Sequence, residues 1–217
     1  MTKAKKAAKS ALIIAIFTLG SKFLGFLREV LIAAKFGSGI ETDTFFIALS
    51  ASSLIGNFLR NSINTTFIPV ISEVESREGR SGKIEHTNNM INVTVVVSII
   101  LITIAILGAP ILVKLLATGF EGEQFDLAVK LTRIGLPMIL YNGVIGVMSG
   151  YLQSEGKFNS TAMIGFPFNF VYIFYLIIFS SIFGIKGLMI AAVIAVISQL
   201  LIQIPEARNT GFKYKFI

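Results

Sequence analysis

The sequence has little of the charge that a water-soluble protein needs on its surface. Of its 217 residues only 14% are charged and 54% are hydrophobic, whereas soluble domains usually carry about 25% charged residues. So few charges would leave the surface of an ordinary cytosolic enzyme poorly solvated. The same composition excludes an intrinsically disordered chain, which combines low hydrophobicity with high charge.

Cysteine and tryptophan are absent altogether, and His86 is the single histidine. The lack of cysteine excludes disulfides, thiolate metal sites and cysteine nucleophiles. No zinc-protease, phosphate-loop or dinucleotide-binding motif occurs, so we predict no enzymatic activity, no metal and no cofactor. The net charge of +7 does not indicate a nucleic-acid partner, because the basic residues lie near the termini and between apolar runs. Such charges orient segments in a membrane.

What is abundant is long apolar runs, which predict an all-α integral membrane protein with one bundle of six transmembrane helices. A spanning helix needs about 20 largely apolar residues. The third run is the cleanest, and the short apolar piece that follows it, 110–116, is expected to lie in the membrane interface. The six spans, which form one domain over 1–217, are predicted at about 10–36, 43–71, 89–107, 125–152, 161–183 and 187–204.

The distribution of Lys and Arg predicts that both termini are cytoplasmic. With the N-terminus inside, the outer segments hold only Lys35, Lys114 and Lys186. The inner segments hold Lys3, Lys5, Lys6, Lys9, Arg77, Arg80, Lys83, Lys157, Arg208, Lys213 and Lys215. The segment 72–85 mixes acidic and basic residues and is expected to be a solvated helical extension plus a turn. The N-terminus also resembles a signal peptide, but no A-x-A-like cleavage site follows.

Polar residues of the first predicted span gather on one side of the helix. Charged residues inside a membrane are costly and usually mark a pathway or a site. At about 100° per residue, the polar side takes up one third of the circumference. It must face protein or water, and it consists of Thr18, Ser21, Lys22, Gly25, Arg28 and Glu29.

A second polar stripe runs along the second predicted span. Its members recur every seven residues, which drifts by only about 20° per step. They are Asp43, Ser50, Asn57 and Asn64, with Ser53, Arg60 and Asn61 within or beside the stripe. Two such helices can line one hydrated cavity, in which three cations and two carboxylates (Lys22, Arg28, Arg60, Glu29, Asp43) leave a net charge of +1. A basic cavity in an apolar wall suits a phosphate or pyrophosphate, which Arg binds through two hydrogen bonds.

A purely structural role for these residues is the alternative. Lys22 and Glu29 lie two turns apart on the same side and could pair, since polar residues in membranes also join helices. Asn169 follows Pro167 by two residues, so it either donates to a ligand or satisfies a carbonyl freed by the proline. Lys130 and Arg133 are expected to reach toward lipid headgroups.

Several motifs resemble a known family. They are SKFLGFLRE at 21–29, AKFG at 34–37, TDTFF at 42–46, FIP at 67–69, the Gly119-Phe120 turn and IGLP at 134–137. Together they resemble the MurJ (MviN) family of lipid II flippases, within the superfamily of multidrug, oligosaccharidyl-lipid and polysaccharide exporters. The resemblance covers essentially the whole chain and implies the N-terminal lobe of a two-lobe transporter, whose partners are a C-terminal lobe and membrane lipids.

The resemblance also implies a function. Family members move lipid II, the lipid-linked precursor of peptidoglycan, from the inner to the outer leaflet of the bacterial inner membrane by alternating access. A cationic central cavity binds the pyrophosphate. By this resemblance Arg28 matches an essential arginine, Glu29 its acidic neighbour, Asp43 the acidic residue that opens the second span, and Asn169 a fifth-span asparagine. Lys22 stands where the family usually has Arg.

The candidate substrate-binding residues are therefore Arg28, Lys22, Glu29, Asp43, Ser21, Gly25 and Asn169, with Asn57, Arg60 and Asn61 as further candidates. The second span departs from the family, which often has paired arginines and an AEGA-like stretch where this chain has Asn57 and then LRNS at 59–62. That departure leaves open a related exporter, either of another polyprenyl-pyrophosphate glycan or of a small molecule coupled to a cation.

Overall fold

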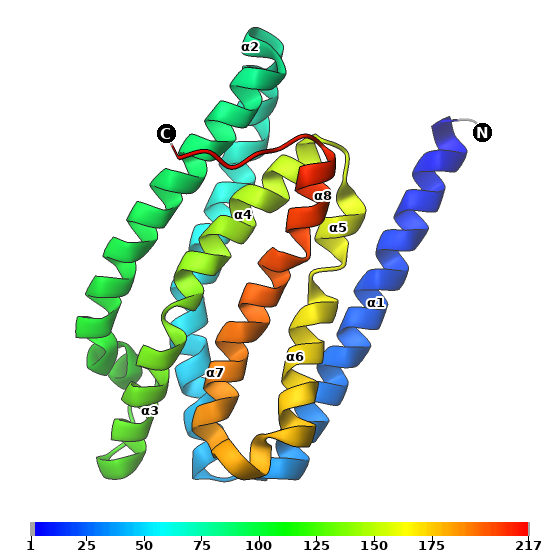
Figure 1. Cartoon of the computed structure of the whole chain (residues 1–217). Coiled ribbons are helices and arrows are strands. Elements are labelled where there is room, and N and C mark those ends of the chain that lie inside the picture. The colour runs from blue at the N-terminus through cyan, green and yellow to red at the C-terminus, as the bar shows by residue number, and fades with distance from the viewer. Residues whose placement is uncertain (1–2, 217) are drawn as a thin grey trace.

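The computed structural model describes the backbone of residues 3–216 and the side chains of residue 12 and residues 14–216. Every regular element in this part of the chain is a helix, as the sequence predicts (Figure 1). The basic side chains of Lys3, Lys5, Lys6 and Lys9 lie outside the described residues. The helices are α1 (Lys3–Phe36), α2 (Ile40–Leu116), α3 (Gly122–Gly135), α4 (Met138–Ser154), α5 (Phe158–Ala162), α6 (Gly165–Ile178), α7 (Ser180–Leu201) and α8 (Gln203–Asn209).

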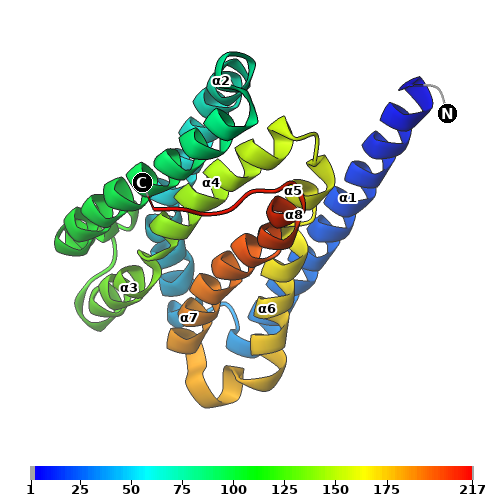
Figure 2. The ribbon, with the colours of Figure 1, turned by 45° about the horizontal axis from the view of Figure 1, so that its top comes forward.

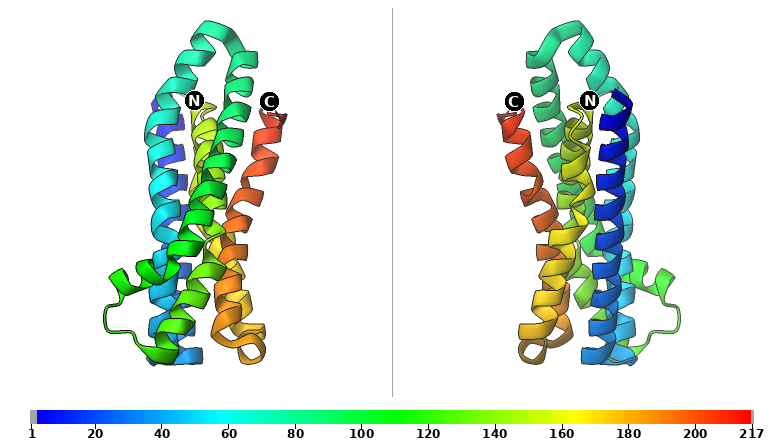
Figure 3. Two further views of the ribbon diagram at one scale, coloured as in Figure 1. Left: turned by 90° about the vertical axis from the view of Figure 1, so that its left-hand side faces the viewer. Right: turned by 90° about the vertical axis from the view of Figure 1, so that its right-hand side faces the viewer.

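Helix α2 consists of two arms that meet at Gly79. The backbone there has φ 71° and ψ −165°, a conformation that glycine adopts without steric cost. The chain reverses at this point, so the arms 40–78 and 80–116 run in opposite directions, and their turn forms the top of the molecule in Figure 3. The sequence predicts a turn within 72–85, where Gly79 lies.

The second arm of α2 runs beyond the end of the third predicted span at about residue 107. The helix continues through Pro110 to Leu116, and the interfacial position expected for 110–116 stays a prediction. Proline has no N–H, so the carbonyl oxygen of Ile106, four residues earlier, loses its helical donor. Arg133 Nε from α3 donates to that oxygen at 3.2 Å. Arg133, expected to reach toward headgroups, thus compensates for the proline.

The other predicted boundaries differ in detail. The run 125–152 corresponds to α3 and α4, which are separated at Pro137. The run 161–183 ends earlier than predicted, at Ile178, and α7 begins at Ser180 with a left-handed backbone at Gly184 (φ 56°). Four helical stretches in the searched, described part are long and apolar enough to cross a membrane: Ile40–Leu116, Gly122–Ser154, Phe158–Ile178 and Ser180–Asn209.

Both ends of the described chain, residues 3 and 216, lie at one end of the bundle, which we call the terminal end. The start of α1, the Gly79 turn, the α4–α5 connection and the end of α8 gather there (Figures 1 and 3). The connections after α1, α2 and α6 gather at the opposite end. Large hydrophobic side chains such as Phe23, Phe26 and Leu107 are exposed on the outside, as expected for helices that face lipid.

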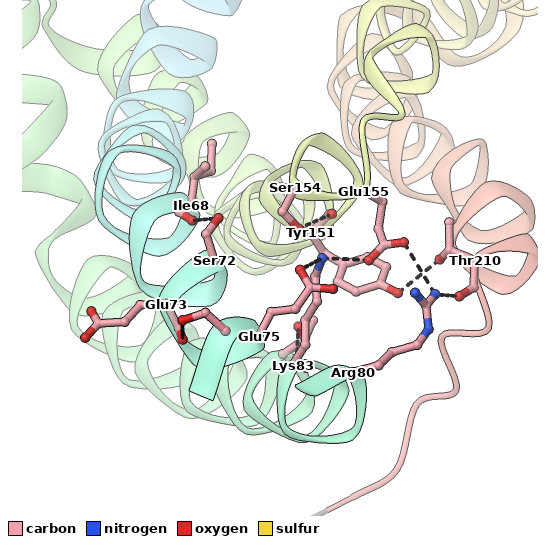
Figure 4. A network of polar contacts seen from close by, with 12 residues as sticks. Ile68, Ser72, Glu73, Glu75, Arg80, Lys83, Tyr151, Ser154, Glu155 and Thr210 are labelled. Carbon is pink, nitrogen blue, oxygen red and sulfur yellow. Dashed lines mark hydrogen bonds and ion pairs between the residues drawn. The ribbon is translucent and has the colours of Figure 1, made fainter. Parts of the chain in front are cut away.

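An ion-pair network around the buried Lys83 lies at the terminal end (Figure 4). Lys83 is only 1% exposed, and its Nζ lies 2.7 Å from Glu75 Oε2 and 2.6 Å from Glu155 Oε1. Arg80 pairs with Glu155 Oε2 at 3.4 Å and donates to the carbonyl oxygen of Thr210. The expectation that 72–85 is a solvated extension is therefore wrong at Lys83, because Glu155, which follows α4, and the ring of Tyr151 in α4 cover it.

Residues 210–216 form an extended strap that leaves α8 and crosses α4 to reach α2 (Figures 1 and 2). Asn88 Nδ2 donates to the carbonyl oxygen of Lys213 at 3.1 Å, and Tyr214 Oη donates to Asn92 Oδ1 at 2.6 Å. The ring of Phe212 packs 5.1 Å from that of Tyr151. The strap thus joins three helices that are far apart in the sequence.

Candidate functional site

Arg28 lies at the centre of a polar group between α1 and α6. Its Nε and Nη2 both donate to Glu29 Oε1, at 3.2 and 2.6 Å, and its Nη1 donates to Asn169 Oδ1 at 3.2 Å. The side chain of Arg28 is 21% exposed and that of Glu29 is 46% exposed. The ion pair therefore has one side open to the surroundings, where a ligand can approach it.

Asn169 fixes this arrangement from α6. Its Nδ2 donates to the carbonyl oxygens of Ser21, at 3.1 Å, and Gly165, at 2.8 Å. With both amide hydrogens engaged, its oxygen is turned toward Arg28. The two helices approach closely here, since a Cβ at Gly165 would overlap Ser21 Oγ. Asn169 therefore acts on the position of Arg28 and holds no free donor for a ligand.

Two aromatic rings of α6 support the guanidinium. Arg28 Cζ lies 5.4 Å from the centroid of Phe168 and 5.1 Å from that of Tyr172. A guanidinium within about 6 Å of an aromatic ring is attracted by the ring's quadrupole. The Tyr172 hydroxyl is buried and makes no hydrogen bond within the described residues. Arg28, Glu29, Asn169, Phe168 and Tyr172 are called the Arg28 cluster below.

The structure brings together only some of the predicted residues. Ser21 contributes its carbonyl oxygen, and a Cβ at Gly25 would lie 3.8 Å from Asn169 Oδ1. Glu29 pairs with Arg28, so the alternative Lys22–Glu29 pair is not formed. Among the described side chains, four predicted candidates are exposed and make no hydrogen bond or ion pair with the Arg28 cluster: Lys22, Asp43, Asn57 and Asn61.

A separate polar cavity of about 270 Å³ lies where α1, α2, α4 and α5 meet. Arg60 and Asn64 line it from α2, and Thr18 lines it from α1. The amide oxygen of Asn64 is buried and has no hydrogen-bond partner among the residues described. The two predicted polar stripes thus share a cavity, but its lining includes Arg60 and excludes Arg28.

Phe168 and Tyr172 were missed by the sequence analysis, as were the α4 residues Ser149 and Gln153 that line the second cavity. The aromatic pair carries a weak signal, because residues four apart share a helix face. Nothing local in the sequence indicates that this face meets Arg28.

The fold and the cluster define a multi-pass helical membrane protein with a charged group held between two helices. A family model described as "Lipid II flippase MurJ" matches residues 32–217. The chain belongs to the MurJ lipid II flippase family.

Curated relatives agree with this assignment. The chain is 31% identical over 171 residues to "Probable lipid II flippase MurJ" of Rhizobium tropici, which covers 76% of this chain and 32% of the relative. It is 27% identical over 206 residues to "Lipid II flippase MurJ" of Burkholderia cenocepacia, covering 93% and 40%. The corresponding Synechocystis protein is 36% identical over 157 residues, covering 71% and 29%.

A solved structure shows the same fold. "Lipid II flippase MurJ, inward closed conformation" superimposes with a TM-score of 0.72 and 22% identity, over 95% of this chain and 43% of that one. The chain spans less than half the length of the relatives that it matches, and it corresponds to roughly their N-terminal lobe.

Proposed function

We propose that the full-length protein moves lipid II, or a closely similar lipid-linked glycan pyrophosphate, from the inner to the outer leaflet of the bacterial inner membrane. Family membership supports the cargo. The observation that carries the proposal is the Arg28 cluster, an intramembrane cation held rigidly with one side open. Such residues mark the path of a polar substrate through a membrane.

In this proposal Arg28 grips the pyrophosphate. A guanidinium has five N–H donors, and here Glu29 takes two and Asn169 one. The remaining donors can bind phosphate oxygens as a planar fork. Glu29 is nearly half exposed, so it can turn toward water when a phosphate competes for Arg28. The exposed Lys22, Asp43, Asn57 and Asn61 then belong to the cavity that the second lobe completes.

The test is growth of cells that lack their own flippase and carry full-length variants. We expect Arg28→Ala to abolish rescue at normal membrane abundance, and Arg28→Lys to be impaired, because an ammonium cannot replace the fork. Lys22→Arg is the matched control and should be tolerated. Normal growth of cells with an abundant Arg28→Ala variant would show that Arg28 does not bind the pyrophosphate during transport. The 217-residue chain alone should not rescue growth, since alternating access rocks one bundle against another.

We further propose six membrane spans with both termini in the cytoplasm. The support is that the Gly79 turn and the α4–α5 connection, which both lie at the terminal end, carry Arg77, Arg80, Lys83 and Lys157, and basic residues are biased toward the cytoplasm. Single cysteines at Ser38, Ser81 and Ser154 should react with an impermeant thiol reagent from outside, inside and inside respectively. Labelling of the Ser81 position from outside would overturn this orientation.

The second candidate is an exporter of another polyprenyl-pyrophosphate glycan, or a cation-coupled exporter of small molecules. The second span favours it, because its arginine, Arg60, lies in a cavity apart from Arg28. The two candidates differ in one experiment. A protein that binds a polyprenyl pyrophosphate through Arg28 in vitro, yet fails to rescue flippase-deficient cells, belongs to the second.

A further inference from the structure

A cavity of about 600 Å³ lies beneath the strap, and none of its lining residues belongs to the Arg28 cluster. Its walls come from α2, α4 and α7, with side chains such as Ile91, Met148 and Leu200, and the strap closes it with Phe212. A water molecule takes up about 30 Å³ in the liquid, so the space is many times larger than a single water site. Its largely apolar walls suit a hydrocarbon chain rather than a cluster of waters.

The edge of the same cavity is basic. Arg208 at the end of α8 and Lys213 in the strap both line it, and no carboxylate does so among the described residues. Neither cation makes an ion pair in the described part of the chain. Of the neighbouring carboxylates, Glu206 is occupied by Lys157 at 2.8 Å. Glu85 lines the next hollow across the strap, which Lys213 also lines, but the two form no ion pair in the described part of the chain. The edge therefore carries two cations, and neither of them is held in an ion pair by the described residues.

The two halves of the cavity lie at different depths. Ile91, Val144 and Leu200 fall within the apolar runs, whereas Arg208 and Lys213 fall beyond them at the terminal end. An apolar part at membrane depth with a cationic part at the surface matches an amphiphile that has an acyl chain and a negative headgroup. Basic pockets between membrane helices bind such headgroups.

We propose that this cavity binds one anionic glycerophospholipid. An acyl chain lies between α2, α4 and α7, and the headgroup phosphate lies between Arg208 and Lys213. The bound lipid would hold the strap against the helices, because both the strap and α8 contribute to its site. This proposal does not depend on the cargo of the Arg28 cluster.

The test is native mass spectrometry of the full-length protein, titrated with phosphatidylglycerol or with phosphatidylcholine of the same acyl chains. We expect the wild type to prefer phosphatidylglycerol. Replacing each cation, in Arg208→Gln and Lys213→Gln, should weaken phosphatidylglycerol binding about fivefold, and roughly thirtyfold in the double variant, from the usual contribution of a surface cation to anionic-lipid binding. Phosphatidylcholine binding should change little.

Two controls separate this site from general electrostatics. Arg77→Gln with Lys114→Gln removes the same total charge from exposed positions outside the cavity and should leave binding unchanged. Val144→Phe extends a half-buried side chain into the apolar part and should weaken binding of both lipids. Three results would overturn the proposal. They are an equal loss of binding in the control double variant, unchanged binding by Val144→Phe, and a wild type that retains neither lipid because a later segment of the chain fills the cavity. Growth rescue by Arg28 variants is a separate readout.

Discussion

Asn169 is the residue on which the geometry of the Arg28 cluster depends. Its side-chain amide donates hydrogen bonds to backbone carbonyls of two different helices, and its side-chain oxygen accepts one from Arg28. An aliphatic side chain of similar size would fill the same space but could not orient the guanidinium. We therefore treat Asn169 as a positioning residue rather than as part of the ligand's contact surface.

Asn169→Leu in the full-length protein should weaken binding of a polyprenyl pyrophosphate about tenfold, the loss of roughly one hydrogen bond to a charged group. The matched combination is Asn169→Leu with Arg28→Lys. If Asn169 acts through Arg28, the double variant should bind little worse than Arg28→Lys alone, because effects within one network are not additive. Fully additive losses, measured by titration of the purified variants, would contradict the positioning role.

The sequence predicted the members of this cluster better than their roles. Helical periodicity alone places Ser21, Gly25, Arg28 and Glu29 on one side of α1. It does not show which helix packs there, because Asn169 lies 141 residues further along the chain. Periodicity also places Glu29 on this side of α1, but it does not decide whether Glu29 pairs with Arg28 or with Lys22.

At the scale of helices, Arg133 in α3 compensates for a backbone hydrogen bond that Pro110 removes from α2. The proline frees the carbonyl of Ile106 within α2, and Arg133 of α3 satisfies it. The glycine turns at 79 and 184 were within reach of sequence analysis, since their left-handed backbone needs glycine. The continuation of α2 past Pro110 was not, because its donor comes from a different helix.

Arg133→Leu should destabilise the purified protein by about 1 kcal/mol, because the carbonyl of Ile106 loses its donor. In a Pro110→Ala background residue 110 again has a backbone N–H that can donate to the carbonyl oxygen of Ile106. Arg133→Leu should then lower the free energy of unfolding much less. Thermal unfolding of the four proteins forms a double-mutant cycle that isolates this coupling. Equal cost of Arg133→Leu in both backgrounds would mean that Arg133 stabilises the helices in another way.

At the scale of the whole molecule, the network around Lys83 ties the Gly79 turn, the end of α4 and the strap together. Burial by itself would lower the pKa of Lys83. The hydrogen bonds and negative charges of Glu155 and Glu75 outweigh this effect, so the pKa is raised above its ordinary value. Arg80 and the Tyr151 hydroxyl also face the network. The lysine is therefore charged in the folded protein.

Lys83→Met should lower the stability of the folded protein by roughly 3 kcal/mol, because it leaves two carboxylates without their shared cation. The contribution also depends on pH. Because the pKa of Lys83 is raised on folding, its contribution to stability is fully present below pH 10.5, the ordinary lysine pKa. That contribution is lost as the pH rises through the higher pKa of the folded protein. The difference in melting temperature between wild type and Lys83→Met should therefore narrow at strongly alkaline pH. A constant difference would rule out this linkage.

The Arg28–Glu29 pair lies on consecutive residues of one helix, and this has a consequence for biogenesis. During synthesis α1 leaves the ribosome long before Asn169, Phe168 and Tyr172 exist. A lone arginine in the middle of a membrane segment opposes insertion by a few kcal/mol, but α1 carries its own counterion beside it. In the proposed six-span topology, the translocon thus receives a segment whose arginine already has a counterion, and α1 can enter the bilayer without waiting for α6. When α6 follows, it has only to orient an arginine that is already in place.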